Sequence, residues 1–62
     1  MPLTPKQMES LLKKNGFLFI SSNGSHHKYF NPQSNKTVIV PFHARDLKRG
    51  IEQAILKQAG LK

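Results

Sequence analysis

The dipeptide Asn23-Gly24 separates two runs with the composition of β-strands, and this arrangement constrains the fold more than any other feature of the chain. Both residues tolerate a positive φ, so Asn-Gly is a strong signal for a tight hairpin turn. The run before it, FLFISS at residues 17–22, is rich in aromatic and β-branched side chains. The run after it covers residues 25–31 and is followed by a proline. We therefore predict an antiparallel hairpin over residues 17–31.

The rest of the sequence predicts a third strand and two helices, one before and one after the strands. Residues 36–41, KTVIVP, predict a third strand, and three consecutive strands with short connections favour a meander. A T-x-x-Q capping box at Thr4 begins a helix that Gly16 ends. A second apolar pattern of helical spacing begins near Gly50 and ends at Gly60. The order is α-β-β-β-α. We expect an α+β domain that resembles the double-stranded-RNA-binding fold, with both helices on one face of a three-stranded antiparallel sheet.

The net charge of the chain limits the kinds of partner that it is expected to bind. Ten Lys and Arg residues stand against three acids in 62 residues, for a net charge of +7. Such a field attracts polyanions, so nucleic acid is a candidate partner. An acidic protein partner, or a basic surface with no ligand, remains the alternative.

The acids are scarce and scattered at Glu9, Asp46 and Glu52. A magnesium-dependent nuclease needs clustered carboxylates to hold its ions, so any nuclease activity here is expected to need no metal and no other cofactor. The chain has no cysteine, which excludes a cysteine-based zinc site.

We expect neither a membrane-spanning segment nor a signal peptide in this sequence. No apolar run approaches the roughly 20 residues needed to span a bilayer. The N-terminal residues lack the basic and apolar regions of a signal peptide. We expect a cytoplasmic protein with no membrane partner, in which residues 1–62 form one domain.

The tandem histidines belong to opposite faces of the predicted strand. Side chains alternate along a strand, so His26, Lys28 and Phe30 share one face while His27 and Tyr29 share the other. The two imidazoles point apart and are poorly placed to bind one metal ion together. We interpret His27 as packed under the helices beside Tyr29, and His26 as reachable. If the helices covered His26 instead, His27 would take the exposed role.

His26 is the candidate for chemistry. The ordinary pKa of histidine, about 6.5, suits proton transfer near neutral pH. His26 follows a tight turn, and Lys28 is its nearest neighbour on the same face. A surface histidine with no catalytic role is the alternative reading.

Three stretches resemble the HicA family of toxins, the ribonuclease halves of toxin–antitoxin pairs: GSHHKYF, VIVPFH and LKRGIEQAILKQAGL. The resemblance covers nearly the whole chain, and its most specific parts are the G-S-H and P-x-H elements. It implies a fold similar to the double-stranded-RNA-binding domain, metal-independent cleavage of single-stranded mRNA, and a HicB-type antitoxin. It places the catalytic histidine at His26 and a substrate or antitoxin contact at His43. One departure is Ile51, where many members have Thr or Ser.

The expected mechanism uses the RNA 2′-OH as the nucleophile. His26 would act as general base, and Lys28 would stabilise charge on the phosphoryl oxygens. His43, Lys28 and water are all candidates for the general acid. Tyr29 and Phe30 are candidates for stacking on a base, with core packing expected of at least one of them. The expected RNA-binding residues are Gly24, Ser25, Lys28, Lys36, His43, Arg45, Lys48 and Arg49. The alternative function is a non-catalytic RNA-binding module of the same shape.

Overall fold

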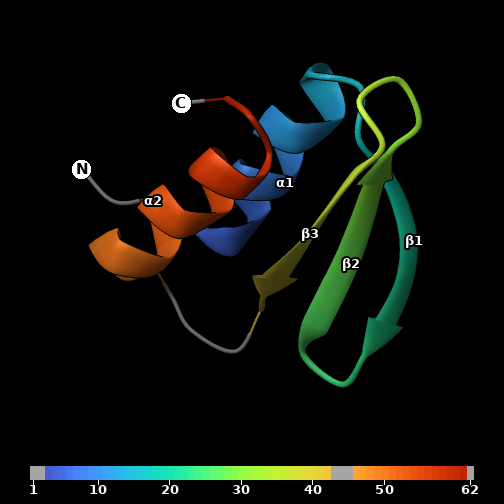
Figure 1. Ribbon diagram of the computed structural model, residues 1–62. Coiled ribbons are helices and arrows are strands. Elements are labelled where there is room, and N and C mark those ends of the chain that lie inside the picture. Colours follow the sequence, from blue (N-terminus) through green and yellow to red (C-terminus); the bar gives the residue numbers. More distant parts are fainter. Residues whose placement is uncertain (1–2, 43–45, 62) are drawn as a thin grey trace.

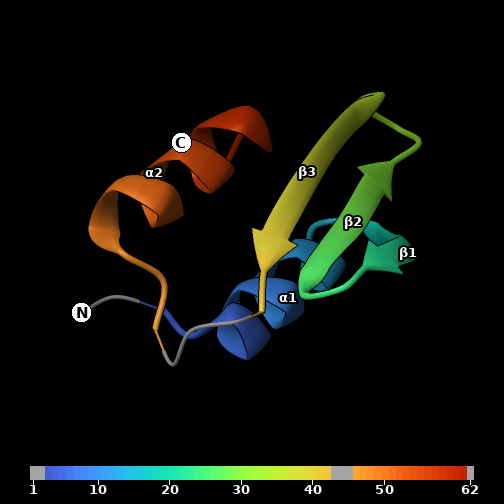
Figure 2. The ribbon, with the colours of Figure 1, turned by 90° about the horizontal axis from the view of Figure 1, so that it is seen from below.

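The computed structural model describes residues 3–42 and 46–61 and has the predicted α-β-β-β-α order. The elements are α1 (Pro5–Lys14), β1 (Leu18–Asn23), β2 (His26–Asn31), β3 (Lys36–Pro41) and α2 (Arg49–Gln58). The strands form one antiparallel sheet in the order β1-β2-β3. Both helices lie on the same side of it, with α2 next to β3 (Figures 1 and 2). The predicted α+β fold is therefore confirmed. Neither described helix combines the length and apolarity needed to cross a bilayer.

The start of α1 is fixed by the predicted capping box. The Thr4 hydroxyl accepts a hydrogen bond from the Gln7 backbone N–H (3.1 Å), and the Gln7 side chain accepts one from the Thr4 N–H (2.9 Å). These two bonds satisfy N–H groups that a helix start leaves without partners. Helix α2 has no such cap, because its N-cap residue Lys48 makes no side-chain cap hydrogen bond. It begins at Arg49, one residue before the predicted start.

Both helices end at the predicted glycines. Gly16 (φ +94°) and Gly60 (φ +77°) take the left-handed conformation that L side chains rarely adopt. After Gly16, the N–H of Phe17 bonds back to the carbonyl of Leu12 (2.9 Å), as in a Schellman ending. This turn sends the Phe17 side chain into the core, so Phe17 is not part of the strand as predicted, and β1 begins at Leu18.

The hairpin turn lies one residue later than the sequence predicts. Its central residues are Gly24 and Ser25, and the φ angle is positive at Gly24 (+62°) but not at Ser25. That pattern matches a type II′ turn, which needs glycine at the first central position. Asn23 therefore belongs to β1, where it pairs directly with His26, and the predicted Asn23-Gly24 turn is wrong.

The two faces of the sheet have the predicted assignment. His26 and Lys28 are exposed, whereas His27 is half-buried and Tyr29 is fully buried under the helices. We call the side that carries His26 the open face. The core on the opposite, helix-covered face consists of Met8, Leu12, Phe17, Tyr29, Val38, Val40, Leu47, Ile55 and Ala59.

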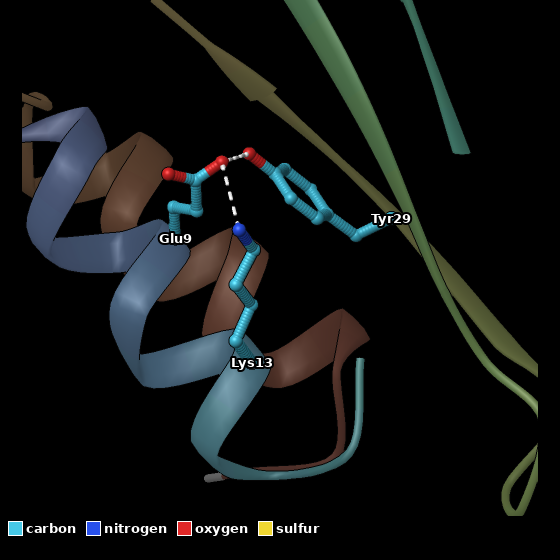
Figure 3. A network of polar contacts seen from close by, with 3 residues as sticks. All are labelled: Glu9, Lys13 and Tyr29. Carbon is cyan, nitrogen blue, oxygen red and sulfur yellow. Dashed lines mark hydrogen bonds and ion pairs between the residues drawn. The ribbon is translucent and has the colours of Figure 1, made fainter. Parts of the chain in front are cut away.

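A part-buried polar contact connects β2 to α1 at the edge of this core. The Tyr29 hydroxyl donates a hydrogen bond to the Glu9 carboxylate (2.5 Å), which also lies 3.9 Å from the Lys13 ammonium (Figure 3). Burial raises the pKa of Tyr29 well above its ordinary value, and the Glu9 carboxylate raises it further. The phenol therefore stays protonated and keeps donating to Glu9.

Glu52 also serves the fold. Its carboxylate accepts a hydrogen bond from the backbone N–H of Leu3 (2.6 Å), while the Leu3 carbonyl accepts one from the N–H of Leu47 (2.8 Å). These bonds tie the N-terminal segment to α2 and to the residues that lead into it. Glu9 and Glu52 are thus both used in contacts that hold helices in place.

Candidate active site

An open hollow lies on the open face of the sheet, next to the β1–β2 turn. It is lined by Ser21, Asn23, His26, Lys28 and Ile39. The structure thereby brings together His26, the predicted general base, and Lys28, the cation predicted to stabilise phosphoryl charge. The other three lining residues were not predicted as site residues.

Strand pairing explains why these five residues share one place. His26 is the first residue of β2, and Lys28 follows two positions later on the same face. On β1, Asn23 lies directly opposite His26, and Ser21 lies opposite Lys28. On β3, Ile39 lies opposite Lys28. Directly paired residues point to the same side of a sheet, so three strands contribute to one hollow.

An irregularity in β1 puts Ser21 and Asn23 on that side. Phe19 pairs with Tyr29, on the helix-covered face, and the register then shifts between Phe19 and Ser21. In a regular strand, residues 19 and 21 would point the same way. The extra residue at this β-bulge reverses the alternation, so Ser21 and Asn23 face the hollow instead of the helices.

His27 lies on the opposite face, as predicted. Its ring stacks on Phe42 (centroids 3.9 Å apart, planes at 14°) and meets Phe19 edge to face (5.7 Å, 66°). Its Nδ1 atom is buried and has no hydrogen-bond partner within the described part of the chain. These aromatic contacts make His27 a packing residue, and the exposed role belongs to His26.

The predicted RNA-binding residues are spread over several places. Gly24 and Ser25 form the turn beside the hollow. Lys36 lies at the far end of β3, where its side chain passes next to Gly60. Lys48 and Arg49 are exposed at the start of α2 but do not line the hollow, and His43 and Arg45 lie outside the described residues.

Apolar side chains border the hollow on the open face. Ile39, which lines it, is 50% exposed, and Leu18, which pairs with Phe30, is 59% exposed. Phe30 is half-buried on this face, so its role as a candidate stacking residue stays a prediction. Tyr29 has no exposed surface, so its predicted alternative role as a stacking platform is wrong.

The chain matches the model of one known protein family over most of its length. The family described as "HicA toxin of bacterial toxin-antitoxin" has a model that matches residues 5–61. The chain belongs to the HicA toxin family. The match runs from the start of α1 to the turn that ends α2, and it includes every residue that lines the hollow. No curated protein matches the chain.

Membership of the HicA family supports a toxin role and implies an antitoxin partner. The hollow gathers side chains of several chemical types. An exposed imidazole can serve as a general base, and a neighbouring ammonium can hold negative charge. Ser21 and Asn23 add hydroxyl and carboxamide groups on the opposite wall.

Proposed function

We propose that this HicA-family chain is a metal-independent endoribonuclease, that is, an mRNA interferase. Residues 1–62 form its single ribonuclease domain. It cleaves single-stranded mRNA in the cytoplasm and so inhibits translation and growth. The observation that best supports the proposal is the exposed His26 beside Lys28 in an open hollow, on a domain with a net charge of +7.

The proposed reaction uses the nucleophile that RNA itself carries. His26 removes the proton of a ribose 2′-OH, and the resulting oxygen attacks the adjacent phosphorus. The P–O2′ bond forms and the P–O5′ bond breaks, which leaves a 2′,3′-cyclic phosphate and a 5′-OH. Lys28 stabilises the charge that develops on the phosphoryl oxygens. Lys28, His43 or a water molecule donates the proton that the departing 5′ oxygen needs.

A HicB-type antitoxin is the proposed inhibitor. The hollow combines a cation, Lys28, with an apolar side chain, Ile39, and is open to approach. An antitoxin segment with acidic and apolar side chains would fit both. Such a segment would cover His26 and stop RNA from reaching it.

Expression without antitoxin tests the function. The wild-type chain is expected to arrest growth and deplete mRNA, whereas His26→Ala is expected to do neither, because the 2′-OH then has no base. Thermal unfolding followed by circular dichroism checks that the variant folds. Equal toxicity of the two chains, or none from either, contradicts the proposal. RNA binding without cleavage by both chains would favour a non-catalytic RNA-binding module.

RNA affinity is expected to fall steeply with salt concentration. Each phosphate contacted by a cation contributes a slope of about −0.7 to log Kobs against log salt on single-stranded RNA. Fluorescence anisotropy with a 2′-deoxy-substituted, uncleavable strand measures the slope. Lys28→Ala is expected to make it less steep by about one contact, or 0.7. Lys57→Ala is a control in α2, because Lys57 is exposed and does not line the hollow. Equal losses of slope in both variants would show that Lys28 acts only through net charge.

A further inference from the structure

We propose that Asn23 is a third catalytic residue of the hollow, beside His26 and Lys28, which rests on the ribonuclease function proposed above. Its side-chain amide donates a hydrogen bond to a non-bridging oxygen of the phosphodiester that His26 and Lys28 act on. Asn23 therefore binds the reacting phosphate from β1, while the two basic side chains approach it from β2.

The position of Asn23 is the first support. It is the last residue of β1 and the direct partner of His26 across the hairpin, and both line the hollow. Opposite residues of an antiparallel pair have Cβ atoms about 5 Å apart. Side chains that start this close, on the same face, can both contact a single phosphodiester group. The type II′ turn creates the pairing, because it leaves Asn23 in the strand.

The second support is that the described part of the fold does not use the side-chain amide of Asn23. Two other asparagine side chains, by contrast, make hydrogen bonds that hold the fold. The amide of Asn15, the residue after α1, donates to the carbonyl of Leu11 (2.8 Å). Asn31 is buried and donates to the carbonyl of Asn15 (3.2 Å). The Asn23 side chain is exposed and makes no hydrogen bond within residues 3–42 and 46–61. The turn does not need this amide either, since Gly24 supplies the positive φ.

The reaction needs such a donor. As the 2′ oxygen adds to phosphorus, negative charge grows on two non-bridging oxygens. Lys28 is one cation with one compact ammonium group, so it serves one of them best. A carboxamide has two N–H donors, and a fixed donor aimed at a developing oxyanion lowers the barrier. Asn23 meets that need from β1, the strand that pairs with the one carrying Lys28.

Three variants test the proposal by single-turnover cleavage of a labelled RNA oligonucleotide. Asn23→Ala is expected to lower kcat by about 10- to 100-fold, less than the loss for a fully buried oxyanion donor, with KM changed by less than about threefold. Asn23→Asp keeps the shape but lacks the N–H donor and adds negative charge, so we expect at least the same loss. Ser22→Ala is the matched control, because Ser22 is the preceding residue of β1 and pairs with His27 on the other face. It is expected to keep wild-type kcat.

The outcomes separate this inference from the ribonuclease proposal. If His26→Ala abolishes cleavage but Asn23→Ala keeps it within about twofold, the role of Asn23 is overturned and the enzyme stands. If Asn23→Asp restores wild-type kcat, the residue serves only the hairpin and the inference is again overturned. If the wild type cleaves no RNA, both proposals fail. Thermal unfolding of each variant separates a loss of kcat from a loss of fold.

Discussion

Replacing His26 with alanine is expected to lower the kcat for RNA cleavage by about 10²- to 10⁴-fold, the range for a positioned general base. His26 is exposed at the edge of a turn, so its removal leaves no cavity in the core. The domain should therefore remain folded while the 2′-OH loses its proton acceptor. Single-turnover cleavage of an end-labelled RNA strand measures the rate, and analysis of the product ends identifies the cyclic phosphate.

Two controls sharpen this result. His26→Gln keeps a polar side chain of similar reach but offers no basic nitrogen, so it is expected to be as slow as His26→Ala. A strand with one 2′-deoxy nucleotide at the cleaved position should resist the wild-type enzyme. Cleavage of that strand would show that the nucleophile is not the 2′-OH. Loss of wild-type activity on addition of a chelator would show that a metal takes part. Either result contradicts the proposed mechanism.

The parts of the fold set by local chemistry could be predicted from the sequence. Thr4 and Gln7 specify the start of α1 through two hydrogen bonds within one turn. Gly16 and Gly60 specify helix ends because few other residues adopt a positive φ. Strand alternation predicted that His26 and His27 lie on opposite faces. Which face the helices cover was decided only by the structure, where Tyr29 is buried and His26 is exposed.

The side chains that β1 contributes to the hollow, Ser21 and Asn23, could not be predicted from the sequence, for a physical reason. All six residues of β1 are exposed, so burial does not determine which of them faces the helices. The segment around Gly24 fits either of two hairpin turns, centred on Asn23-Gly24 or on Gly24-Ser25. A shift of one residue reverses the face of every side chain in the strand. The bulge between Phe19 and Ser21 reverses it again, and nothing in FLFISS marks that position.

Replacing Tyr29 with alanine is expected to cost about 3–5 kcal/mol of unfolding free energy, the usual loss for a large buried aromatic side chain. Tyr29 is the largest fully buried side chain among the described residues, and its ring contacts Phe19 edge to face (5.7 Å). A 62-residue domain has little stability to lose, since small domains lie near the lower end of about 5–15 kcal/mol. Urea unfolding followed by circular dichroism should show a largely unfolded variant. A loss below about 1 kcal/mol would mean that the core does not depend on this ring.

Tyr29→Phe isolates the hydroxyl and gives a pH signature. Because burial and Glu9 raise the pKa of Tyr29 in the folded chain, the protonated phenol stabilises the fold fully below the ordinary tyrosine pKa of about 10. This contribution is lost as the pH rises from there through the folded pKa, since the unfolded tyrosine ionises first. The wild-type chain should therefore lose stability above pH 10 more steeply than Tyr29→Phe.

Lysine deprotonation affects both proteins equally, so the difference between their curves reports the phenol. Tyr29 is the only tyrosine, so absorbance of the tyrosinate follows the same group directly. Parallel stability curves, or ionisation near the ordinary pKa while the chain is still folded, would show that the Tyr29–Glu9 contact does not hold β2 to α1.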